Sequence, residues 1–288
     1  MNARLRLPSR LASAGGLLPL TLWEAAFYFV PAILLFFTSF WVLERYSLAA
    51  NWTLANYQQV FGKRIYFDAY LTSLWLSIST VLIAVALAYP AAYAVAFVVP
   101  PRWQRACMIA MIIPFWTNYL VRAYAWQLVL ANNGLINYLL LKTGLRTEPV
   151  KILYTHVATR IGLVHFLVVL LTLALYTRME AIDRNLLEAA HDLGASRLRA
   201  FFEVIVPLTR GAAITGVMFI FVLAFADFIS PAVLGGQTRR VFPQLVVDAI
   251  QNDVNYPLAA AFATVMVATI LLVVGILSRF QSRAEGGA

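Results

Sequence analysis

The side chains best suited to covalent or metal chemistry are few in this sequence. Its single cysteine, Cys107, excludes an internal disulfide and a CxxC site. Neither paired carboxylates nor further cysteines accompany the three histidines, so they form no metal-ligating set. These histidines are His156, His165 and His191. No HExxH or GxSxG motif appears, so we expect no catalytic residue, no metal and no bound cofactor.

A carboxylate inside an apolar segment is a stronger candidate for a binding role. Asp227 lies roughly 17 residues into an apolar stretch at 211–234, hence about 25 Å from its start. Arg122 lies at a similar depth in the stretch 107–130. Ionisable groups inside a membrane are costly and are functional candidates by default. Asp227 either faces a pathway, where it would bind an organic ammonium, or pairs with Arg122. Alternatively, the Arg122 side chain snorkels to the outer headgroups.

Polar and aromatic residues accompany Arg122 along the third apolar stretch. Aromatic rings next to a carboxylate suit an organic cation through charge and cation–π contacts. The same rings would also suit an interfacial aromatic belt, and an asparagine there could bond a neighbouring helix. Pro114 predicts a kink or an opening in this stretch. The candidate pathway residues, together with Asp227, are Trp116, Asn118, Tyr119 and Tyr124.

A charged segment, EAAHDLGASRLRAFFEVIVPL at 188–208, interrupts the apolar sequence. Asp183 can cap a helix that Gly194 would end in a left-handed conformation. Ser196 can cap a second helix, which we expect to run until Pro207. The sequence therefore predicts a helix-turn-helix elbow. An ordinary amphipathic loop beside the membrane is the alternative.

The elements that position these residues follow from composition. The chain has 288 residues, of which 62% are hydrophobic and only 12% charged. Soluble domains carry about 25% charged residues, so this chain is an integral membrane protein. Backbone groups in lipid must be satisfied within each segment, which predicts helices. We expect six, at 22–43, 70–99, 107–130, 157–177, 211–234 and 258–279.

The net charge of +9 comes from basic residues in short loops between apolar segments. The positive-inside rule explains this pattern better than nucleic-acid binding, and it places both termini in the cytoplasm. The predicted organisation is a cytoplasmic segment at 1–21, a membrane domain at 22–280 whose loop at 178–210 contains the elbow, and a cytoplasmic tail at 281–288.

Three stretches resemble signatures of permease subunits of binding-protein-dependent type I ABC importers. The elbow resembles their EAA motif. IPFWTNYLVRAYAW at 113–126 and PAVLGG at 231–236 are similar to spermidine/putrescine permeases. The resemblance implies an all-α permease fold in the bacterial inner membrane, whose elbow is a coupling helix seated in an ATPase. The coupling residues it implies are Glu188, Ala189, Ala190, Asp192, Gly194, Ala195, Phe201 and Pro207.

The resemblance also implies partners and a solute. The partners are a second related permease, two copies of a cytoplasmic ATPase that uses ATP and Mg, and a periplasmic solute-binding protein. A phosphate loop is absent, since Gly62-Lys63 is followed by Arg64, so the ATPase must be another chain. The implied solute is a polyamine. Relatives that carry γ-aminobutyrate, opines or phosphonates keep those solutes as alternatives.

Two other classes fit less well. An intramembrane enzyme would need a nucleophile and base, or metal ligands, facing one another within the spans. An ion-gradient-driven transporter would show broken helices at matching positions in two repeated halves, and Pro114 and Pro231 do not match in this way.

Overall fold

Helices make up nearly all of the fold. The computed structural model describes residues 19–44, 47–49, 51–236 and 240–285. Within these ranges the chain forms two compact units, one from the part up to residue 64 together with 246–265, the other from 65–245 together with the part after residue 265. The predicted all-α class is confirmed, apart from a two-stranded hairpin of β1 (Val42–Glu44) and β2 (Ser47–Ala49).

The described residues contain five single helices that are long and apolar enough to cross a membrane. A bent helix pair raises the number to six, which matches the six predicted spans. The first predicted span, 22–43, extends too far, because its helix ends at Thr38. The five helices are Pro19–Thr38, Arg64–Val98, His156–Glu180, Arg197–Ala226 and Tyr256–Gln281.

The predicted third span is broken rather than merely kinked. It starts with α5 (Pro101–Ile112) and the 3₁₀ turn η3 (Ile113–Trp116). After the break it resumes as α6 (Tyr119–Leu130), and the two halves are bent by 93°. Pro114 lies in η3, where it has no N–H to donate. Asn118 begins the second half, because its side-chain oxygen accepts a hydrogen bond from Leu120 N at 2.9 Å.

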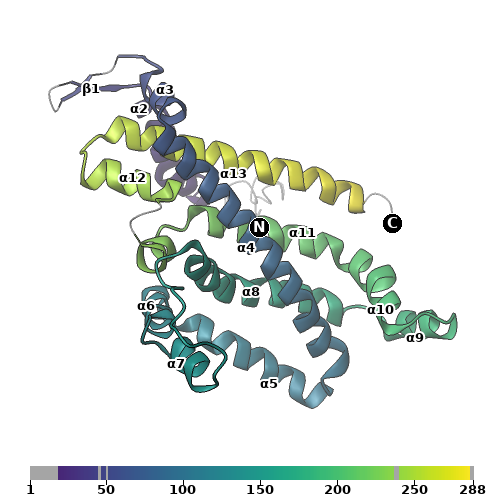
Figure 1. Ribbon diagram of the computed structural model, residues 1–288. Coiled ribbons are helices and arrows are strands. Elements are labelled where there is room, and N and C mark those ends of the chain that lie inside the picture. Colours follow the sequence, from purple (N-terminus) through teal and green to yellow (C-terminus); the bar gives the residue numbers. More distant parts are fainter. Residues whose placement is uncertain (1–18, 45–46, 50, 237–239, 286–288) are drawn as a thin grey trace, which may run out of the picture. The chain divides into compact units, whose positions relative to one another are not determined.

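The core of the larger unit is built from α4 (Arg64–Tyr93), α8 (His156–Glu180) and α11 (Val206–Ala226). α8 and α11 lie side by side (Figure 1). On α4 the buried positions recur every fourth residue as alanines, which allow neighbouring helices to approach closely. These are Ala84, Ala88 and Ala92, all fully buried.

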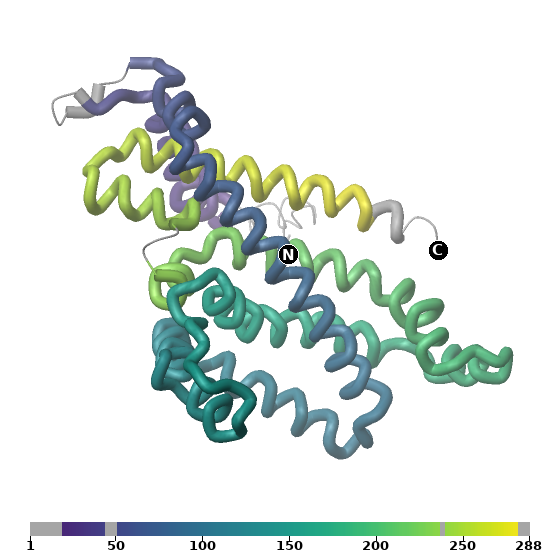
Figure 2. The backbone as a smooth tube through the Cα atoms, in the orientation of Figure 1, coloured from purple at the N-terminus to yellow at the C-terminus, as the bar shows by residue number. Residues whose placement is uncertain are grey.

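The predicted elbow follows α8. It consists of α9 (Arg184–Asp192) and α10 (Arg197–Ala200), and the chain turns back between them (Figure 2). The expectation that Pro207 ends the second helix is wrong. A π-helical turn, η4 (Phe201–Ile205), joins α10 to α11, and Pro207 lies at the start of α11. Pro207 is tolerated there because it stands next to a change in hydrogen-bond register.

The predicted fifth span, 211–234, is wrong at both ends. Its helix begins at Arg197 in the elbow and stops at Ala226. Asp227 is extended, with φ −73° and ψ 122°, and a short separate helical segment follows. That segment contains the π-helical turn η5 (Pro231–Gly235). Asp227 therefore lies at a break between two helices instead of inside one.

The connection between α6 and α8 contains α7 (Leu135–Lys142). Asn137 of α7 is buried and fixes this connection through its amide. Its Nδ2 donates to the Ala131 and Val150 carbonyls at 3.1 Å each, and its Oδ1 accepts from Val150 N at 2.8 Å. The segment that leads into α8 is thus held against α7.

The smaller unit contains η1 (Ala25–Phe29), α2 (Val30–Thr38), the hairpin and α3 (Ala55–Gly62). Asn56 of α3 is buried and donates to the carbonyls of Ser39 and Trp41. Ser39 and Tyr57 also share a hydrogen bond of 2.6 Å. α12 (Phe242–Gln251) and α13 (Tyr256–Glu285) contribute residues to both units, as does α4 through Arg64.

Candidate functional site

The elbow is capped as the sequence predicts. Asp183 accepts a hydrogen bond from Asn185 N at 3.0 Å, and Ser196 accepts one from Arg199 N at 3.3 Å. Gly194 has φ +85°, a conformation that favours glycine. Two bonds close the helix end, from Gly194 N to His191 O at 2.8 Å and from Ala195 N to Ala190 O at 2.9 Å. This is a Schellman motif, which fixes the angle between α9 and α10.

Most of the elbow surface is exposed. Leu193, at its tip, is 90% exposed, and no residue of α9 is buried. Of the predicted coupling residues, Ala190 and Ala195 are half-buried at the turn. The elbow therefore leaves most of its surface accessible within the described part of the chain. The exposed coupling residues are Glu188, Ala189, Asp192, Gly194 and Pro207.

The base of the elbow is anchored to α4. Phe201 packs edge-on against Tyr89 and Tyr93, with ring centroids 5.9 and 5.6 Å apart. Tyr89 also shares a hydrogen bond of 3.3 Å with Thr209. Because Phe201 is half-buried in these contacts, it holds the elbow in place instead of presenting itself at the surface.

A hydrogen-bonded cluster surrounds Asp227. Tyr119 donates its phenolic hydrogen to Asp227 Oδ2 at 2.6 Å. Ser230 Oγ lies 2.6 Å from the same phenolic oxygen, so the serine donates to it. Asp227 Oδ1 accepts from Ile229 N at 2.9 Å. The carboxylate thereby joins the start of α6 to the beginning of the short helical segment that follows α11 and contains η5.

Arg122 and Asp227 form no ion pair within the described part of the chain. Arg122 is only 9% exposed, and its guanidinium lies over the Phe166 ring, 4.5 Å from the centroid. It donates a long hydrogen bond of 3.5 Å to the Pro114 carbonyl. The predicted ion pair between Arg122 and Asp227 is therefore not formed. The Arg122 side chain instead reaches from α6 across the break in its own segment to the Pro114 carbonyl. Snorkelling to headgroups also fails, because the side chain is buried.

The remaining candidate pathway residues differ in placement. Trp116 is 84% exposed at the end of η3, next to the break in the third span. Asn118 uses its side-chain oxygen as a helix cap. Tyr124 is exposed on α6, away from the Asp227 cluster's hydrogen bonds. The structure thus brings Tyr119 to Asp227 but shows no contact of Trp116, Asn118 or Tyr124 with that carboxylate.

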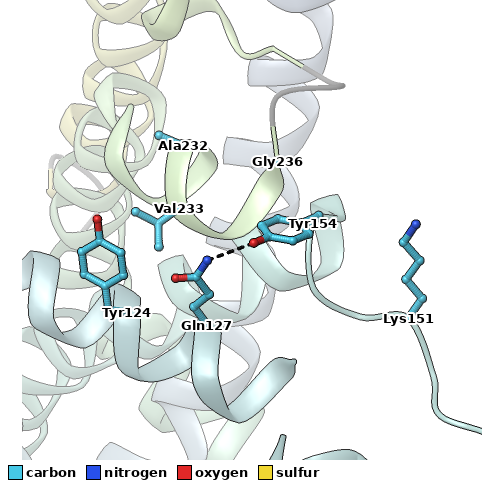
Figure 3. Close-up of a pocket in the computed structure, with 7 residues that line it drawn as sticks. All are labelled: Tyr124, Gln127, Lys151, Tyr154, Ala232, Val233 and Gly236. Carbon is cyan, nitrogen blue, oxygen red and sulfur yellow. Dashed lines mark hydrogen bonds between the residues drawn. The ribbon is translucent and has the colours of Figure 1, made fainter. Parts of the chain in front are cut away.

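Tyr124 instead borders a pocket of about 690 Å³ (Figure 3). The walls come from α6, from the segment before α8, and from η5 with the residue after it. Gln127 points toward Tyr154 and donates to its phenolic oxygen at 3.1 Å. The described residues that line it are Tyr124, Gln127, Lys151, Tyr154, Ala232, Val233 and Gly236.

Some site residues were not predicted from the sequence. Ser230 completes the Asp227 cluster, and Lys151 and Tyr154 line the pocket. A sequence signal for Ser230 was present. Asp227 stands shortly before Pro231, which is typical of a helix start, and Ser230 lies between them. No comparable pattern marks Lys151 and Tyr154, which meet the other pocket residues only in the folded chain.

Known proteins resemble the chain over nearly its whole length. The spermidine/putrescine transport system permease protein PotB of Escherichia coli is 32% identical over 264 residues, which cover 91% of this chain and 94% of PotB. The inner membrane ABC transporter permease protein YdcU of Escherichia coli is 29% identical over 274 residues, which cover 90% of this chain and 86% of YdcU.

The fold is also found among solved structures. A chain of a bacterial ABC transporter involved in the import of alginate, an acidic polysaccharide, superposes with a TM-score of 0.79. The match covers 95% of this chain and 96% of the other at 16% identity, so it establishes the fold alone. Residues 84–285, which contain the elbow, the broken third span and Asp227, match one family by sequence. With these features and relatives, the chain belongs to the family of binding-protein-dependent transport system inner membrane components.

Proposed function

We propose that this chain forms part of the membrane pathway of an ATP-driven importer, and that the solute is a polyamine such as spermidine or putrescine. The names of PotB and of the putrescine permease PotI, which is 32% identical over 109 residues, support this solute. The observation that carries the proposal is the acceptor geometry of Asp227.

An ionised carboxylate offers about four acceptor positions on its two oxygens. Asp227 uses its shortest bonds to receive the Tyr119 hydroxyl and the Ile229 N–H. Ser230 N approaches both oxygens at 3.3 and 3.4 Å, which are long contacts. Because no cation of the described chain pairs with Asp227, and because its side chain is partly exposed, acceptor positions on the carboxylate remain for an ammonium group.

The elbow supplies the link to ATP. In the proposed orientation both termini and the elbow lie in the cytoplasm, where α9 and α10 dock on one of two ATPase subunits. ATP and Mg are used in that partner and not in this chain. A second permease would complete the pathway, and a periplasmic binding protein would deliver the solute. The fixed turn at Gly194 and the Phe201 anchor support this role, because a flexible loop would absorb movement.

The test is uptake of labelled spermidine by cells with and without the gene, in a background that lacks every other polyamine system. Loss of uptake on deletion, competed by putrescine but not by γ-aminobutyrate, an opine or a phosphonate, is the expected result. Unchanged spermidine uptake would refute the polyamine assignment. Competition by one of the other three would reassign the solute.

A further inference from the structure

The pocket beside Tyr124 presents hydrogen-bond donors and a single kind of charge. Gln127 donates to the Tyr154 oxygen, so the Tyr154 hydroxyl hydrogen remains available. Within the described residues, no hydrogen bond or ion pair uses Lys151 Nζ or the Tyr124 hydroxyl. Among the described residues of the lining, Lys151 is the only charged one. Its ammonium group attracts an anionic oxygen and repels a second ammonium group, and the two tyrosine hydroxyls can donate to the same anion. The pocket is therefore distinct from the proposed polyamine site.

The Tyr154 wall is held in an uncommon conformation. Tyr154 has φ +62°, in the left-handed region that few residues other than glycine adopt. Its N–H donates to the Leu234 carbonyl at 2.9 Å. Gly236 lies against it, with φ +70°, and a Cβ there would stand 2.9 Å from Tyr154 Cβ. Strained backbone that its surroundings hold in place is concentrated at ligand sites, which favours a binding role for this wall.

The pocket also lies at a definite depth. Tyr154 immediately precedes Thr155, whose side chain caps α8. α8 has 25 residues, from His156 to Glu180. At 1.5 Å per residue it is about 37 Å long, which exceeds the roughly 30 Å hydrocarbon core. When α8 crosses a bilayer, this length carries the end at the pocket to headgroup level, on the side opposite the elbow.

We propose that this pocket binds the phosphate group of an anionic phospholipid in the leaflet at that end of α8. Lys151 and the Tyr154 hydroxyl would receive the phosphate oxygens, as basic residues near membrane surfaces attract anionic headgroups. The Val233 and Ala232 side chains form an apolar wall for the adjoining glycerol and acyl carbons (Figure 3). Phosphatidylglycerol fits better than a zwitterionic lipid, because Lys151 would repel the ammonium of the latter.

The test measures lipid retention, so it does not depend on transport. The full chain, purified with the subunits that assemble with it, is placed in nanodiscs of mixed phosphatidylglycerol and phosphatidylcholine and analysed by native mass spectrometry. We expect selective retention of phosphatidylglycerol, reduced about fivefold by Lys151→Gln. Tyr154→Phe should reduce it less. Lys142→Gln, which removes an exposed lysine of α7 outside the pocket, is the matched control and should retain the lipid.

Three results would overturn the proposal. Equal retention of phosphatidylglycerol by the wild type and Lys151→Gln would refute the role of Lys151. Equal loss of the lipid in Lys142→Gln would show that general charge governs retention. The third result would identify an acidic protein surface as the occupant. If Lys151→Gln weakens association with the soluble binding protein in pure phosphatidylcholine nanodiscs, while phosphatidylglycerol retention is unchanged, the pocket is a protein contact.

Discussion

Tyr119 and Asp227, 108 residues apart in the sequence, share a hydrogen bond of 2.6 Å that joins the broken third span to the break after the fifth. Both residues stand at helix boundaries, Tyr119 at the start of α6 and Asp227 just after α11. Helix breaks at membrane depth expose backbone groups that need partners. The Asp227 carboxylate meets part of this need, and its negative charge is the feature that the proposed function assigns to recognition of a cationic solute.

Removing that charge without removing the cap tests the solute role. Asp227→Asn keeps a side-chain oxygen that can accept from Ile229 N, but it carries no negative charge. We expect spermidine uptake to fall at least tenfold while the amount of protein in the membrane stays normal. Asp253→Asn, an exposed change outside this cluster, is the control. Full uptake by Asp227→Asn would refute the role of the carboxylate.

Tyr119→Phe tests whether the carboxylate must be held in place. The change removes both hydrogen bonds of the phenolic oxygen, the one to the Asp227 carboxylate, worth about 1.5–3 kcal/mol, and the one with Ser230, and it leaves the ring on Phe166. We expect the KM for spermidine to rise more than the maximal rate falls, because the ammonium meets a less ordered acceptor. Tyr138→Phe on exposed α7 serves as the control. An unchanged KM would contradict a positioning role for Tyr119.

Gly194→Asp tests the elbow. The left-handed φ costs a non-glycine residue roughly 1–2 kcal/mol, with aspartate among the better tolerated, and no atom lies within 4 Å of the added Cβ. The variant should fold, hydrolyse ATP in the assembled transporter, and lose coupled transport.

Gly144→Asp is the matched control for this elbow variant, since Gly144 has φ +71° and equally open surroundings beyond α7. It introduces the same charge and the same strain away from the elbow. Normal uptake by Gly194→Asp at equal abundance, or equal loss in Gly144→Asp, would contradict the coupling role.

Asn137→Ala tests the support of the pocket. The substitution removes three hydrogen bonds of a buried amide and leaves the Val150 backbone without partners. The expected loss of stability is about 2–3 kcal/mol. Hydrogen exchange should accelerate most in residues 143–155, which include two pocket residues. Asn132→Ala, at an exposed position in the same connection, should leave exchange unchanged. Unchanged exchange in Asn137→Ala would show that the segment is held by other contacts.

Local sequence patterns predicted the elbow, because its caps depend on near neighbours. Asp183, Gly194 and Ser196 each act within a few residues of their own position. The apolar spans were also predictable, since hydropathy reports burial in lipid directly. The end of the second elbow helix could not be predicted in this way. A π-helical turn accommodates Pro207, and hydropathy carries no signal for such a turn.

The break at Asp227 was missed for a related reason. Apart from Asp227 and Ser230 the residues around Ala226 are apolar, so hydropathy predicts one continuous helix where the structure has two. The Tyr119 bond could not be predicted either, because it depends on how two distant helix ends meet. For Arg122, depth alone suggested a carboxylate partner, whereas aromatic packing on Phe166 takes that place.

The continuous helix from Arg197 to Ala226 converts rotation at one end into displacement at the other. With 30 residues it is a rod about 45 Å long. A tilt of this rod by about 5° about its elbow end would carry the far end through about 4 Å, roughly the width of a methylene chain. Asp227 is attached to that far end. A small angular input at the elbow would therefore move the carboxylate away from the Tyr119 hydroxyl, and in the proposed transport role this would release a bound amine.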